Sequence, residues 1–168
     1  MDINIASIKN YEGKSIPIDC SLPLEGRAGD DFRIIGPIKL SGTIRNFGGT
    51  IELDATGEAE LELTCDRCAE EYTLAVEFDV AESFKETERF ESGEENENPD
   101  IIYFTGDSID LDEHVYSNLV VSLPGKHLCS EDCAGICPMC GVNLNRETCK
   151  CDTRPTDPRF DILDNLDL

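Results

Sequence analysis

The chain has 168 residues, of which 36 are acidic and 14 are basic, so its formal net charge at pH 7 is −22. Hydrophobic residues make up 39% of the sequence and charged residues 30%, which is typical of a folded protein with an ordinary hydrophobic core. No apolar run approaches the roughly 18 residues of a membrane-spanning helix, and we expect no membrane partner. The negative charge repels phosphate backbones over most of the surface, so any contact with nucleic acid would be local.

The first residues, MDINIASIKNYEGK, lack the basic start and apolar core of a secretory signal. We therefore expect a cytoplasmic protein. In a reducing cytoplasm, clustered cysteines more often bind metal than form disulfides. Eight of the nine cysteines of this chain are clustered and are therefore candidate metal ligands.

Alternating apolar residues predict antiparallel strands in the first part of the chain. The segment IPIDCSLPL, residues 16–24, alternates with period two and places Cys20 on the buried face as a small core residue. Gly36-Pro37 and Ser41-Gly42 are interpreted as breaks or bulges.

The clearest strand signal lies between residues 47 and 84. FGGT, residues 47–50, predicts a turn, and Thr56-Gly57 is interpreted as a second turn. AELELTC then alternates with Cys65 on its apolar face, CDRC forms a turn, and EYTLAVEFDVAESF returns as the next strand. The pattern predicts a long hairpin whose tip carries two thiols.

Residues 85–100 are strongly acidic and are interpreted as a loop. A short strand is expected at residues 101–104, followed by a helix over residues 110–123. Asp110 could cap this helix and Glu113 could reach back to it in a capping box. The apolar stripe of the helix comprises Leu111, Val115 and Leu119, and Pro124-Gly125 ends it.

The segment 126–152 has few large apolar side chains, so it cannot order itself by burying a core. It contains CSEDCAGICPMCGVNLNRETCKC, which holds six of the nine cysteines. The CPMCG knuckle and the CKC pair can direct four sulfur atoms at one tetrahedral Zn²⁺. The first predicted site therefore comprises Cys137, Cys140, Cys149 and Cys151.

The remaining clustered thiols predict a second zinc site, which would join the hairpin tip to the start of the cysteine-rich segment. Its ligands would be Cys65, Cys68, Cys129 and Cys133. Several alternatives stay open: exchange of ligands between the sites, His127 as a substitute ligand, an iron–sulfur cluster, or a redox dithiol. No nucleophile–base pair or phosphate-binding loop is present, so the sequence predicts no enzyme and no small-molecule substrate.

Together these patterns predict an α+β protein in two parts. Residues 1–125 would form a mainly antiparallel β-sheet or barrel-like body with one main helix. Residues 126–168 would form a zinc-stapled module and tail that binds one or two Zn²⁺ ions.

Three motifs in this order resemble the YceD family, described as large ribosomal RNA subunit accumulation proteins. They are LTCDRCAEEY, IDLDEHVYSNLVVSLP, and LCSEDCAGICPMCGVNLNRETCKC with the later DPRF. The resemblance implies a cytoplasmic factor that supports accumulation of 23S rRNA and assembly of the large ribosomal subunit, without catalysis. It implies the pre-50S particle, its rRNA or a basic ribosomal protein as partner. The tail FDILDNLDL is acidic where basic residues would be expected, which weighs against RNA binding there.

Basic residues in or near these motifs are the candidate contacts for such a partner: Arg67, Lys126, Arg146, Lys150, Arg154 and Arg159. One alternative is an acidic chaperone or adaptor for a basic ribosomal protein, with the loop 85–100 as its attractive feature. Another is a redox or metal-transfer protein.

Overall fold

The computed structural model of the protein describes residues 1–29, 31–87 and 101–151. The chain divides into two compact units. One contains Met1–Leu63 and Thr73–Gly125, and the other contains Thr64–Tyr72 together with the residues from Lys126 onward. Neither helix in the described ranges has the length and apolar character needed to cross a membrane.

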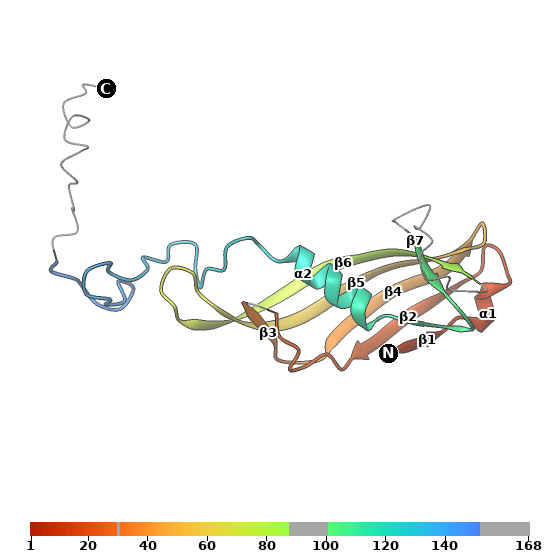
Figure 1. Ribbon diagram of the computed structural model, residues 1–168, viewed down its shortest axis with the longest axis horizontal. Helices are drawn as coiled ribbons and strands as arrows, with labels where there is room; N and C mark the ends of the chain where they lie inside the picture. Colours follow the sequence, from red (N-terminus) through yellow and green to blue (C-terminus); the bar gives the residue numbers. More distant parts are fainter. Residues whose placement is uncertain (30, 88–100, 152–168) are drawn as a thin grey trace, which may run out of the picture. The chain divides into compact units, whose positions relative to one another are not determined.

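The first unit is built on one sheet, in which neighbouring strands are mostly antiparallel (Figure 1). The order across the sheet is β2 (Ser15–Leu22), β4 (Ile38–Phe47), β5 (Thr50–Thr64), β6 (Glu71–Glu86) and β7 (Ile101–Phe104). β3 (Phe32–Ile34) also pairs with β5, and β1 (Asp2–Asn4) pairs with β8 (Ser108–Asp110) in a separate antiparallel ribbon. α1 covers Ala6–Lys9. The prediction of a mainly antiparallel β fold is confirmed.

Period-two alternation accounts for the long strands. In β5, Ile51, Leu53, Leu61 and Leu63 are all buried, while the residues that alternate with them on the other face are more exposed. β4 and β5 are joined by Gly48 and Gly49, which have φ of 61° and 81°. Two consecutive positive φ values suit the tight turns that match strand twist, so the predicted FGGT turn is confirmed.

Two predicted breaks are wrong, because both glycines lie inside continuous strands. A Cβ at Gly57 of β5 would lie 2.4 Å from Cζ of Phe78, so the missing side chain makes room for that ring. A Cβ at Gly42 of β4 would lie 2.3 Å from the backbone oxygen of Asp54. Each glycine marks a close approach within the sheet rather than a turn.

One pairing departs from the antiparallel pattern. β7 pairs with β6 in parallel, with Ser83 opposite Ile101. β6 continues to Glu86, past the predicted start of the acidic loop at Lys85. Residues 88–100, the rest of that predicted loop, lie outside the described residues, as do residues 152–168 of the predicted tail.

The helix α2 spans Asp112–Ser122 and buries Val115 and Leu119, as its apolar stripe predicts. The predicted capping box is wrong. Leu111 occupies the N-cap position, and the Asp110 carboxylate accepts a hydrogen bond from the Asp112 N–H at 3.1 Å. Glu113 instead accepts two hydrogen bonds from the Arg27 guanidinium, at 3.0 and 2.8 Å, because a bidentate ion pair is available to it.

α2 lies against the sheet through both polar and aromatic contacts (Figure 1). The His114 ring meets the buried Phe84 of β6 edge-on, with ring centroids 5.3 Å apart. Asn118 donates a hydrogen bond to the Glu82 carboxylate at 2.6 Å. His114 therefore lies at the edge of the core.

Replacing Asn46 with alanine is expected to destabilise the first unit by about 1–3 kcal/mol. The Asn46 amide is 3% exposed and donates to the carbonyls of Ile8 at 3.0 Å and Lys9 at 2.6 Å. Without the Asn46 side chain, these two carbonyls lose a hydrogen-bond partner where water has little access. Urea denaturation measures the change, with Ser21→Ala on the exposed face of β2 as control; equal midpoints for the two variants would contradict this role.

Candidate metal centre

The tip of the β5–β6 hairpin carries two thiols, those of Cys65 and Cys68. β5 ends at Thr64, and six residues lead to β6, too few for anything but an antiparallel return. The Cys65 N–H donates to the Glu70 carbonyl at 2.9 Å, and the Ala69 N–H donates to the Cys65 carbonyl at 2.8 Å. These bonds close the turn and leave Cys65 and Cys68 only 2% and 5% exposed.

The start of the cysteine-rich segment is held against this tip by backbone and side-chain hydrogen bonds. The Asp66 N–H donates to the His127 carbonyl at 2.8 Å, and the His127 N–H donates to the Asp66 carboxylate at 2.7 Å. The Arg67 guanidinium donates to the Cys133 carbonyl at 2.9 Å. His127 thus contributes its backbone, and its imidazole belongs to neither group of four ligands formed by the described residues.

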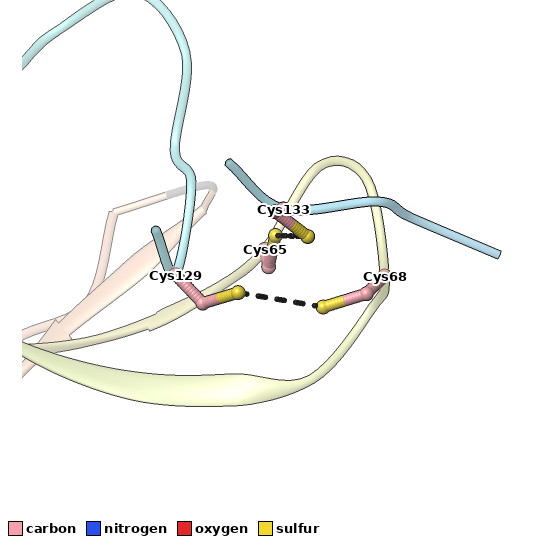
Figure 2. Close-up of side chains that lie close together, drawn as sticks. All are labelled: Cys65, Cys68, Cys129 and Cys133. Atoms are coloured by element: carbon pink, nitrogen blue, oxygen red, sulfur yellow. Dashed lines mark hydrogen bonds between the residues drawn. The ribbon is translucent and has the colours of Figure 1, made fainter. Parts of the chain in front are cut away.

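Four sulfur atoms meet at this position (Figure 2). The sulfurs of Cys65 and Cys133 are 3.8 Å apart, and those of Cys68 and Cys129 are 3.7 Å apart. All four lie within 4.8 Å of one another. A tetrahedral ion with Zn–S bonds of about 2.3 Å separates its sulfur ligands by about 3.8 Å. This first quartet (Cys65, Cys68, Cys129, Cys133) therefore has dimensions that suit such an ion.

A second quartet forms within the cysteine-rich segment itself, from Cys137, Cys140, Cys149 and Cys151. The sulfur of Cys149 lies 3.2 Å from that of Cys137 and 3.5 Å from that of Cys140. The knuckle closes because the Gly141 N–H donates to the Cys137 carbonyl at 2.8 Å, with Gly141 at φ 74°. A positive φ favours glycine at this position.

Backbone N–H groups point at two sulfur atoms of the second quartet. The Met139 N–H lies 3.4 Å from the Cys137 sulfur, and the Cys151 N–H lies 3.2 Å from the Cys149 sulfur. Such donors stabilise a thiolate, which is the form that binds metal. All nine cysteines are free thiols.

Each quartet contains at least one thiol with a lowered pKa, which ionises readily, and at least one with a raised pKa, which does not. Burial raises the pKa of Cys65, yet backbone N–H groups of Cys129, Cys68 and Arg67 outweigh it and lower that pKa to about 6. Backbone N–H groups of Cys140 and Met139 lower the pKa of Cys137 to about 6.

The crowded neighbours shift in the opposite direction. A hydrogen bond to the Cys133 sulfur, followed by burial, raises the pKa of Cys129 to about 12. Hydrogen bonds to the sulfurs of Cys149 and Cys140 raise the pKa of Cys151 to about 12. Four thiolates in so small a volume require a cation between them, so the donor set fits a thiophilic divalent metal.

The basic residues predicted to contact a partner differ in the structure: some are paired within the protein and others are exposed. Arg67 donates to main-chain carbonyls near the first quartet, and Arg146 pairs with Glu70 at 2.8 Å. Lys126 and Lys150 are exposed. Arg154 and Arg159 lie outside the described residues.

The described residues thus define a mainly β protein with two four-cysteine groups that could each hold a metal ion. Residues 53–167 match the family described as "Large ribosomal RNA subunit accumulation protein YceD". The chain belongs to this family, as its motifs predict. The family description names no chemical reaction.

Curated relatives include uncharacterized proteins of Mycobacterium bovis and of two strains of Mycobacterium tuberculosis. Each is 28% identical to this chain over 99 residues, which is 59% of this chain and 44% of the relative. The match thus spans less than half the length of these relatives. No solved structure matches the chain.

Proposed function

We propose that this protein is a non-enzymatic, zinc-binding factor that supports the accumulation of 23S rRNA and the assembly of the large ribosomal subunit in the cytoplasm. The observation that carries the proposal is the family match over residues 53–167, which contains both cysteine quartets and the elements that position them. The partner would be the pre-50S particle, through its rRNA or a basic ribosomal protein.

Metal would serve an architectural role in this function. Cys65, Cys68, Cys129 and Cys133 would hold one ion, and Cys137, Cys140, Cys149 and Cys151 a second. The described part of residues 126–168 buries few large apolar side chains. Metal–sulfur bonds would therefore supply the order that a hydrophobic core supplies elsewhere, and residues 126–168 would act as one metal-stapled module.

Charge favours a basic protein as the direct partner. The described residues of the second unit carry six acidic and four basic side chains. Each quartet of thiolates around a divalent ion adds a further charge of −2. The metal-bound unit is thus negative, which attracts basic ribosomal proteins and repels phosphate. The exposed Lys126 and Lys150 are the remaining described candidates for a local rRNA contact.

Co-sedimentation from cell extract tests the proposal. We expect the protein to migrate with pre-50S particles at low salt and to be absent from mature 70S ribosomes. Depletion of the protein should lower the ratio of 23S to 16S rRNA. Normal 23S levels and no migration with any ribosomal particle would contradict a role in assembly.

Treatment of the extract with RNase before pull-down identifies the partner. Retention of a basic ribosomal protein supports the direct protein contact that the charge favours. Loss of every ribosomal component after RNase, together with weaker binding by a Lys126→Glu and Lys150→Glu double variant, would instead assign the contact to rRNA. Lys39→Glu, an exposed change in the first unit, is the matched control.

A further inference from the structure

One polar side chain lies between the two quartets. Asn145 sits in the loop between Cys140 and Cys149, both ligands of the second quartet, yet its side chain reaches the first. Its amide nitrogen donates to the Cys133 sulfur at 3.3 Å, and its amide oxygen accepts a hydrogen bond from the Ala134 N–H at 2.7 Å. A residue held by one site therefore positions a ligand of the other.

The loop that carries Asn145 has its own hydrogen bonds. The Leu144 N–H donates to the Gly135 carbonyl at 2.9 Å, and the Glu147 N–H donates to the Asn143 carbonyl at 3.0 Å. The Asn145 amide also donates to the Asn143 side-chain oxygen at 2.9 Å. Both ends of this loop lie at the second quartet, because Cys140 and Cys149 flank it.

We propose that Asn145 couples the two metal sites, so that closure of the second quartet on its ion raises the affinity of the first. This inference rests on the proposed metal binding by both quartets. Its physical basis is that the hydrogen bond from the Asn145 amide to the Cys133 sulfur fixes the direction of that ligand's side chain. By linkage, an ion in the first quartet raises the affinity of the second by the same factor.

Because the Asn145 amide orients a metal ligand, its removal gives an expected size for the loss of metal affinity. Loss of a partner that orients a metal ligand typically weakens metal binding by about 10–100-fold. The nearby carboxylate of Glu147 is exposed and serves as a position for a control in the same loop.

The experiment measures the occupancy of each site separately, in zinc-buffered solutions of the full chain. Cys129 and Cys151 are exposed members of the first and second quartets, so their protection from iodoacetamide, read by mass spectrometry, reports the filling of each site. Three variants are compared with the natural chain: Cys140→Ser, Asn145→Ala, and both changes together. Glu147→Gln is the control.

Coupling predicts that Cys140→Ser and Asn145→Ala each raise the zinc concentration that half-protects Cys129 by about tenfold or more. It also predicts that the double variant is no worse than the single ones, because both remove the same contact. Asn145→Asp keeps an acceptor for the Ala134 N–H but brings a carboxylate to the sulfur, so it should weaken the first site at least as much. Glu147→Gln should leave both midpoints unchanged.

Two results would overturn the coupling alone: unchanged protection of Cys129 in Cys140→Ser, or multiplicative effects in the double variant. In both cases the natural chain would still bind two ions, and the proposed metal sites would stand. Zinc that protects neither Cys129 nor Cys151 in the natural chain would instead remove the metal sites, and the coupling with them.

Discussion

Cys68→Ser is expected to lower the zinc content from two ions per chain to one and to unfold the start of the cysteine-rich segment. Cys68 and Cys129 are 61 positions apart in the chain, and their sulfurs lie 3.7 Å apart. Structural zinc sites contribute apparent binding free energies of about 10–16 kcal/mol. Removal of one ligand therefore removes most of what orders this segment.

Elemental analysis and limited trypsin digestion measure both effects. In the variant, cleavage after Lys126 and Arg67 should become rapid, since these exposed residues lose their fixed backbone. Cys20→Ser is the matched control, because Cys20 is a half-buried thiol outside both quartets. Unchanged zinc content and digestion in Cys68→Ser would show that the first quartet holds no structural ion.

Gly42→Ala is expected to destabilise the first unit by about 3 kcal/mol, the upper part of the usual range for overpacking. The new Cβ would lie 2.3 Å from the Asp54 oxygen and 2.4 Å from the Ala55 Cα. Both are backbone atoms of β5, and β2 pairs with β4 on its other side, so β4 cannot move away without breaking pairs.

Gly36→Ala is the control for the added methyl group, because a Cβ at Gly36 meets nothing within 4 Å. Thermal or urea denaturation of the two variants should separate them clearly. Equal stability of Gly42→Ala and Gly36→Ala would mean that β4 and β5 are not as close at Gly42 as described.

Alternation of apolar residues predicts the long strands because a sheet with one buried face repeats its environment every two residues. The same logic fails at Gly57. A glycine inside an alternating run fits either a turn or a close approach, and only the position of Phe78, 21 residues later, decides between them. The parallel pairing of β7 with β6 is likewise invisible locally, because a short apolar strand can pair in either direction.

Cysteine spacing carries more information, since two thiols on one knuckle can both reach one ion. It predicts the same two sets of four sulfurs that the structure brings together, and their metal occupancy stays a prediction.

Spacing does not predict the roles of Arg67 and Asn145, because each contact crosses between segments. Arg67 reads as a free cation for RNA, yet its guanidinium donates to the carbonyl of Cys133, 66 positions away. Asparagine favours turns, and the Asn145 N–H does donate a local hydrogen bond to the Asn143 side-chain oxygen at 2.9 Å. The donation from the Asn145 side chain to the Cys133 sulfur appears only once the chain is folded.

Metal content of the purified, reduced full chain addresses the two quartets most directly. Elemental analysis should give two zinc ions per chain, and exhaustive chelation should make the segment from Lys126 to Cys151 sensitive to protease. A chain that contains no metal, and that stays equally resistant to protease after chelation, would contradict the conclusion that these eight thiols hold the second unit together.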